Sequence, residues 1–178
     1  MPEDPIAATR RWLQRAVIGL NLCPFAKAVV ARQQVRFVLS EATTPEALLE
    51  DLGTELVLLR DTPAERIDTT LLIHPQVLTD FFDYNDFLDD ADALVEALML
   101  DGLLQVASFH PQYQFADSDV DDIENYSNRS PYPMLHLLRE DSVARAVEAF
   151  PDPDTIVERN KMTLRKLGHQ GWRILLGL

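Results

Sequence analysis

Apolar residues recur along this chain at two spacings, one typical of helices and one typical of strands. Spacings of three and four residues predict helices over 5–20, 24–33, 45–60, 79–100, 142–150 and 154–167. Short alternating or wholly apolar runs predict strands over 34–40, 69–73 and 103–109, and residues 134–138 are either a fourth strand or the lead into the next helix. The tail, 169–178, is expected to add a short strand or to pack Trp172 on the core.

Strands that alternate with helices long enough to serve as crossovers predict an α/β fold. We expect a single domain over residues 1–178, with a small, mostly parallel sheet of about four strands and helices on both faces. In such sheets ligands bind beyond the carboxyl ends of the strands. Residues that follow strands are therefore the first candidates for a site.

The longest interruption of these patterns lies within residues 105–140, where an apolar run gives way to a polar segment and then returns. Loops of this length in a small domain are usually functional or disordered. Four aromatic residues, Tyr113, Phe115, Tyr126 and Tyr132, can anchor the segment. We therefore expect an ordered loop that forms part of a site.

Composition narrows the class of protein. The 178 residues are 47% hydrophobic and 25% charged, as in ordinary folded proteins, and the formal net charge of -13 disfavours nucleic acid and anionic membranes as partners. No apolar run approaches the ~20 residues that span a bilayer, and the first residues lack a signal pattern. A single cysteine excludes an internal disulfide. The expected location is the cytoplasm, and the oligomeric state stays open.

Cys23 is the first candidate for chemistry. The first predicted helix breaks near Gly19, and Pro24 can start the next helix, which places Cys23 at its N-cap. Thiols at helix N-termini are more acidic than free thiols, and the thiolate is the nucleophile. The alternative is that Cys23 is a small hydrophobic residue buried between Leu22 and Phe25.

Two histidines, His74 and His110, follow consecutive predicted strands, and each precedes a proline. If those strands are neighbours, both rings lie on one rim of the sheet and could bind zinc or another divalent transition metal, with Cys23, His136 or Glu41 as the third ligand. Alternatively, His110 or His136 is the general base for Cys23, with Glu140 orienting the imidazole of His136. A histidine in such a place is also an ordinary core residue with its own hydrogen bonds.

The string NYSNRSPYP, residues 125–133, crowds amides, hydroxyls and a guanidinium against prolines. A guanidinium fork recognises a carboxylate or phosphate with two hydrogen bonds, so the string suits a small anionic ligand. The candidate substrate-binding residues are Asn125, Asn128, Arg129, Tyr132 and, beyond the string, Arg139. The alternative role is structural: Arg129 pairs with a loop acid, and the amides satisfy buried backbone groups.

The strings NLCPFA (21–26), SFHPQYQFA (108–116) and NRSPYPMLHLLRE (128–140) resemble a bacterial family known as domain of unknown function 1415. The resemblance covers nearly the whole chain, and NRSPYP is its most specific part. It implies a shared bacterial cytoplasmic domain, and no biochemical role comes with it.

The residues leave three functions open, and with them the question of whether the protein is an enzyme. The first is an enzyme that acts on a small anionic molecule through the Cys23 thiolate, with His110 or His136 as the base and no cofactor. The second is a metal-dependent enzyme that uses His74, His110 and His136. The third is a non-catalytic binding protein that contacts its partner through residues 125–133.

Overall fold

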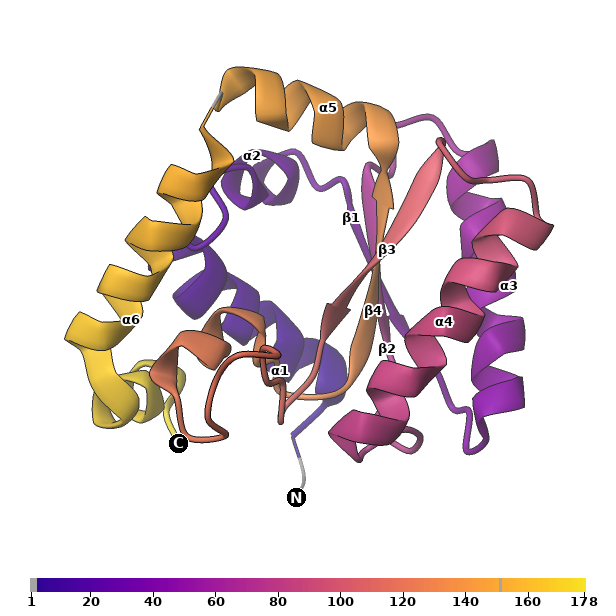
Figure 1. Ribbon diagram of the computed structural model, residues 1–178. Coiled ribbons are helices and arrows are strands. Elements are labelled where there is room, and N and C mark those ends of the chain that lie inside the picture. The colour runs from indigo at the N-terminus through magenta and orange to yellow at the C-terminus, as the bar shows by residue number, and fades with distance from the viewer. Residues whose placement is uncertain (1–2, 151) are drawn as a thin grey trace.

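The computed structural model describes residues 3–150 and 152–178 and contains a four-stranded sheet with helices on both faces (Figure 1). The strands are β1 (Val35–Leu39), β2 (Thr69–Ile73), β3 (Leu104–Phe109) and β4 (Met134–Arg139), in the spatial order β1-β2-β4-β3. The α/β class predicted from the sequence is confirmed. Residues 134–138 belong to a strand, the first of the two alternatives.

The sheet is mixed, which corrects the mostly parallel arrangement expected from the sequence. β1 pairs in parallel with β2, whereas β4 runs antiparallel to both β2 and β3. The physical reason lies in the connection after β3. A parallel neighbour of β3 would need a long crossover connection, usually an α-helix. Residues 110–133 instead contain only a short 3-10 helix, η2 (Ile123–Asn128). The chain therefore returns directly and inserts β4 beside β3.

Two helices, α3 (Pro45–Asp61) and α4 (Phe81–Ala97), cover one side of the sheet, which we call the α4 face (Figure 1). Each has a side-chain cap, because the Thr44 hydroxyl accepts from the Ala47 N–H at 3.2 Å and the Asp80 carboxylate accepts from the Asp83 N–H at 3.1 Å. Their apolar side chains pack on those of the strands and form one core: Leu48, Leu52, Leu56, Leu59, Tyr84, Phe87, Ala91 and Val95 with Leu72, Leu135 and Leu137.

The opposite side, which we call the α6 face, is covered by α1 (Pro5–Trp12), the π-helix η1 (Leu13–Ile18), α2 (Ala26–Ala31) and α6 (Pro153–Leu176) (Figure 1). A further helix, α5 (Glu140–Ala149), follows β4. The second core lies here and contains Trp12, Ala16, Leu71, Ile73, Met134, Leu164 and Trp172. No helix within residues 3–150 and 152–178 has both the length and the apolar character that crossing a bilayer requires.

Several predicted helix boundaries change by a few residues. The first helix continues as a π-helix only to Ile18, and the second begins at Ala26 instead of residue 24. The helix predicted over 154–167 ends where expected, at a kink at Gly168, whose φ of 67° lies in the left-handed region that glycine adopts without strain, and a further helical segment continues to Leu176. The tail is therefore helical and does not form a strand. Trp172, which is 4% exposed, packs in the core, as the second of the two expectations for the tail had it.

Candidate functional site

The loop of residues 110–133 is held together by two of the predicted binding residues. Asn125 is fully buried: its Oδ1 accepts from the Phe115 N–H at 3.0 Å, and its Nδ2 donates to the Asp119 carbonyl at 2.8 Å. Arg129 donates from Nε to the Tyr113 carbonyl at 3.0 Å. Both side chains therefore form hydrogen bonds with backbone groups of their own loop. Arg129 contacts backbone carbonyls, whereas the structural alternative from the sequence had it pair with an acidic side chain of the loop.

Beside this loop lies a pocket of about 730 Å³, which we call the thiol pocket. Buried side chains from η1 and α6, such as Val17 and Leu164, form its floor. The complete wall consists of Val17, Leu22, Cys23, Phe109, Phe115, Ala116, Asp117, Ser118, Asp122, Glu124, Ser127, Asn128, Val157, Asn160, Lys161 and Leu164. Pockets of this size and largely apolar character are the usual sites for small molecules.

The Cys23 thiol is free and exposed on the wall of the thiol pocket, which rules out its role as a buried hydrophobic residue. It does not cap a helix, because α2 begins at Ala26 with Phe25 as its N-cap. Asn160 of α6 fixes the segment, since its Nδ2 donates to the Leu22 carbonyl at 2.8 Å. The thiol is thus held against the pocket by a residue far away in the sequence.

Asn128 is the predicted binding residue that shares the thiol pocket with Cys23. Its Nδ2 donates to the Ser108 carbonyl at 3.1 Å, and its Oδ1 accepts from the Ser127 hydroxyl at 2.9 Å. The amide oxygen can accept one further hydrogen bond, because a carbonyl oxygen has two lone pairs. Asn128 therefore offers a ligand an acceptor.

His110 lies on the α4 face, where it packs on Phe81 and Tyr84. It is fully buried, and both ring nitrogens are used: Nδ1 accepts from the Gln112 N–H at 3.0 Å, and Nε2 donates to the Leu78 carbonyl at 3.0 Å. Burial lowers the pKa of this imidazole. The ring has the hydrogen bonds of a core histidine and no free lone pair for Cys23.

His74 lies next to His110 on the same face, with its ring stacked on Tyr84. Its Nδ1 donates to the Val77 carbonyl at 2.9 Å, while Nε2 is buried and has no partner within the described residues. Burial, together with the nearby His110, lowers the pKa of His74 to about 4. The ring is therefore neutral near pH 7.

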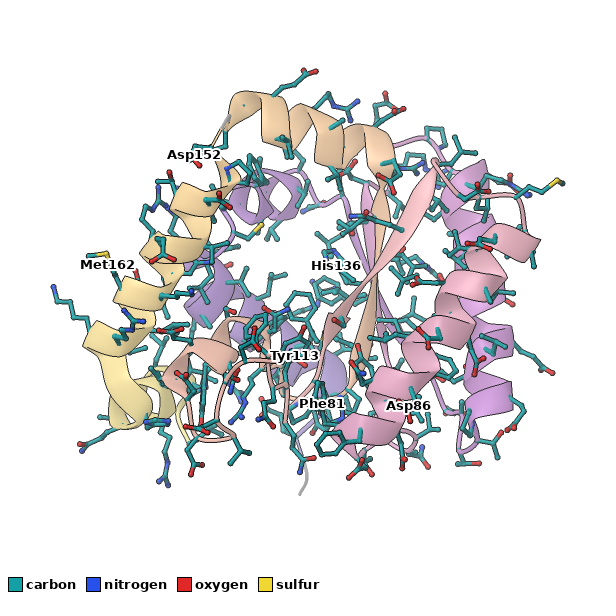
Figure 2. All side chains as sticks on the ribbon, viewed as in Figure 1. Phe81, Asp86, Tyr113, His136, Asp152 and Met162 are labelled. Atoms are coloured by element: carbon teal, nitrogen blue, oxygen red, sulfur yellow. The ribbon has the colours of Figure 1, made fainter. Side chains whose placement is uncertain are left out.

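His136 projects from β4 on the opposite side, the α6 face, and is labelled in Figure 2. Thr69 donates its hydroxyl proton to the Leu137 carbonyl at 2.6 Å, so the Nε2 of His136, 2.7 Å from Thr69 Oγ1, is the donor to that hydroxyl. Burial lowers the pKa of His136 to about 4. The ring contacts Phe109, which lines the thiol pocket, but His136 itself does not line it.

The three histidines of the metal alternative do not come together, because His74 and His110 lie on the α4 face and His136 lies on the α6 face. Within residues 3–150 and 152–178, no group of three or more His, Cys, Asp or Glu side chains is placed to hold a metal ion. The structure thus lends this alternative no support.

Arg139 and Glu140 lie at the end of β4, away from both Cys23 and Asn128. The Arg139 guanidinium donates to the carbonyls of Leu59, Thr62 and Ile67 at 2.6 to 2.9 Å, which ties β4 to the end of α3. Glu140 is the first residue of α5, where the helix dipole stabilises a carboxylate. In the part of the chain that the structure describes, no hydrogen bond joins Glu140 to His136.

Arg129 and Tyr132 contribute to a second pocket of about 430 Å³, which we call the arginine pocket. Its wall consists of Glu3, Ala8, Arg11, Trp12, Pro111, Tyr126, Arg129, Ser130, Pro131, Tyr132, Trp172, Arg173, Leu176 and Leu178. The two pockets share no wall residue. Sequence reasoning joined Arg129 to Cys23 in one site, whereas the structure places them in different pockets.

Several wall residues were not foreseen from the sequence, among them Trp12, Asn160, Lys161 and Arg173. They come from α1 and α6, whose patterns indicate ordinary amphipathic helices. The sequence gives no local signal that sets Asn160 apart, because it is one of several polar residues on α6.

Comparison with known proteins agrees with the resemblance noted in the sequence. Residues 4–174 match the family described as Protein of unknown function (DUF1415). Neither the curated proteins nor the solved structures contain a match. Because the match covers nearly the whole of the 178 residues, the chain belongs to the DUF1415 family.

Proposed function

We propose that this protein binds a small, largely apolar and uncharged molecule in the thiol pocket, where the Cys23 thiol attacks an electrophilic carbon of that molecule. One observation carries the proposal: the exposed thiol of the chain's single cysteine lies on the wall of a 730 Å³ pocket with a buried apolar floor. Such a pocket holds a ligand by removing its apolar surface from water.

The charges on the wall favour an uncharged ligand over the anionic one expected from the sequence. Asp117, Asp122 and Glu124 line the pocket, and Lys161 is its cationic wall residue. Lys161 pairs with Glu158 at 3.4 Å, and Glu124 pairs with Arg165. An anion would enter a rim with more carboxylates than ammonium groups, in a protein whose net charge is -13.

Polar contacts for the ligand come from Asn128 and Asn160, which face the pocket from the loop and from α6. The remaining acceptor site of Asn128 suits an N–H or O–H group of the ligand. His136 supplies no direct base, because it does not line the pocket. The reaction therefore depends on the thiolate fraction of Cys23 and on how the pocket holds the electrophile.

The test compares two maleimides with the same reactive group, neutral N-phenylmaleimide and anionic N-(2-carboxyethyl)maleimide. In each case the sulfur of Cys23 adds to the carbon–carbon double bond, an S–C bond forms, and the neighbouring carbon takes a proton from water. The ratio of the two rates in the unfolded chain gives the intrinsic preference. We expect the folded protein to favour the neutral reagent by about tenfold more than the unfolded chain does.

Two valine variants control for the pocket. Val157 lines it and is half exposed, so Val157→Trp should fill the entrance and return the rate ratio to that of the unfolded chain. Val147, an exposed valine on α5 outside the pocket, gives the matched variant Val147→Trp, which should keep the preference. Equal ratios in the folded and unfolded states would overturn the proposal, and a preference for the anionic reagent would return the site to an anionic substrate.

A further inference from the structure

We propose that the arginine pocket is a second, independent ligand site, and that it binds a small aromatic carboxylate. The pocket lies between α1, α6 and the loop of residues 130–132. It has a volume of about 430 Å³, which lies within the ordinary range for small-molecule sites. It shares no wall residue with the thiol pocket, so the proposal does not rest on the function proposed above.

Positive charge is concentrated here in a strongly acidic protein. Three arginines, Arg11, Arg129 and Arg173, line the pocket, out of 16 Lys and Arg residues in the chain. Arg11 pairs with Glu3, and Arg129 donates to the carbonyls of Tyr113 and Val120. The guanidinium of Arg173 has no hydrogen bond or ion pair within residues 3–150 and 152–178. It is the group best placed to take a carboxylate with two hydrogen bonds.

A second observation points to an oxygen ligand. Trp12 lines the pocket and is 2% exposed, yet its indole N–H has no hydrogen-bond partner within the described residues. A buried donor without a partner destabilises the fold, because it has lost its hydrogen bonds to water. Because almost none of the indole nitrogen is accessible to solvent, a carboxylate oxygen would satisfy this donor once a side chain of the wall shifts to admit it. Arg173 and Trp12 could then hold the two oxygens of one carboxylate.

The walls fit an aromatic body. Tyr126 and Trp172 meet edge to face with ring centroids 5.3 Å apart, and Tyr132 and Trp12 complete the ring-lined wall. The Arg129 guanidinium carbon lies 4.6 Å from the centroid of the Tyr126 ring, which fixes that ring in place. Aromatic rings of a ligand gain both apolar burial and edge contacts on such walls. An inorganic anion would use the arginines but leave these walls unfilled.

The two tryptophans of the chain both line this pocket, so indole N–H signals in a nitrogen–proton correlation spectrum report on it directly. The variant Trp172→Phe assigns the Trp12 signal. Benzoate is the probe, with uncharged benzamide and inorganic phosphate as comparisons. We expect benzoate to move the Trp12 indole proton downfield, and we expect each comparison compound to bind about tenfold more weakly or worse.

Arg173→Gln should weaken benzoate binding by about tenfold, because it removes the unpaired guanidinium. Arg145→Gln, on α5 and outside the pocket, is the matched control and should leave binding unchanged. Equal binding of benzamide would overturn the carboxylate assignment, and equal binding of phosphate would overturn the aromatic one. No movement of the Trp12 signal with benzoate would overturn the site, while leaving the maleimide result at Cys23 untouched.

Discussion

The rings of Trp12 and Phe109 meet edge to face, with centroids 5.3 Å apart and an interplanar angle of 73°. Phe109 lines the thiol pocket and Trp12 lines the arginine pocket, so this pair of rings lies between the two cavities. Edge-to-face pairs contribute about 0.5–1.5 kcal/mol beyond the burial of their surface. The contact therefore stabilises the fold and both pockets together.

Replacing Phe109 by leucine keeps an apolar side chain but removes the ring edge that Trp12 contacts. We expect Phe109→Leu to lower the free energy of unfolding by about 1–2 kcal/mol and to shift the Trp12 indole N–H signal. Urea denaturation and the same correlation spectrum measure both effects. Phe82→Leu is the control, because Phe82 is 70% exposed and should change neither quantity. A stable Phe109→Leu variant would argue against the importance of the ring pair.

Tyr84 joins α4 to the sheet through its hydroxyl group. The hydroxyl donates to the Met134 carbonyl at 2.7 Å and accepts from the Phe109 N–H at 3.1 Å, and the residue is fully buried. Tyr84→Phe removes both of these hydrogen bonds from the buried side chain, so we expect a loss of about 1–3 kcal/mol in denaturant unfolding. Tyr132→Phe, whose hydroxyl has no hydrogen bond within the described residues, should cost much less.

Arg36 on β1 and Glu55 on α3 form a two-point ion pair with distances of 2.8 and 3.1 Å. The Glu55 side chain is only 8% exposed, whereas that of Arg36 is 36% exposed. Arg36→Met leaves a buried carboxylate unpaired, and we expect a loss of about 1–3 kcal/mol, reduced by the solvent that reaches Arg36. The double variant with Glu55→Leu should recover most of this loss in a double-mutant cycle. Additive losses would contradict the prediction.

The pKa of His74, lowered to about 4 by burial from an ordinary value of 6.5, predicts how stability depends on pH. Between pH 6.5 and about 4 the unfolded chain binds a proton at this residue that the folded protein does not, so stability falls as the pH falls. We expect His74→Asn, whose amide can still donate to the Val77 carbonyl, to reduce this slope by up to about 1.4 kcal/mol per pH unit. Urea midpoints across this pH range test it. An unchanged slope would show that His74 does not contribute.

Arg139 was a candidate for substrate binding, but its contacts predict a structural role. The Arg139 guanidinium reaches the carbonyls of Leu59, Thr62 and Ile67 with one planar fork, which an ammonium group lacks. We therefore expect Arg139→Lys to lower the free energy of unfolding by about 1–3 kcal/mol. Binding of benzoate and the maleimide rate ratio should stay at their original values below the unfolding transition. A loss of either with unchanged stability would restore the binding role.

Local patterns in the sequence were enough to predict most helices and strands, because periodicity and caps act between residues only a few positions apart. Thr44 before Pro45 begins α3, and the apolar run that becomes β2 is fully buried, as such runs predict. The sequence around Cys23 and around Asn128 also indicated that both residues belong to a site, and the two do line the same pocket. Their role in binding stays a prediction.

The direction of β4 and the grouping of the side chains depended on contacts between distant segments. His136 lies opposite Leu71 and Ala107 in the sheet, and this register, with the alternation of side chains along a strand, puts it on the face away from His74 and His110. Asn160 reaches the Cys23 segment, and Arg173 lines a pocket with Arg129, only because α6 packs on the loop of residues 110–133. Such packing brings together residues over 40 positions apart, and no local pattern in the sequence encodes it.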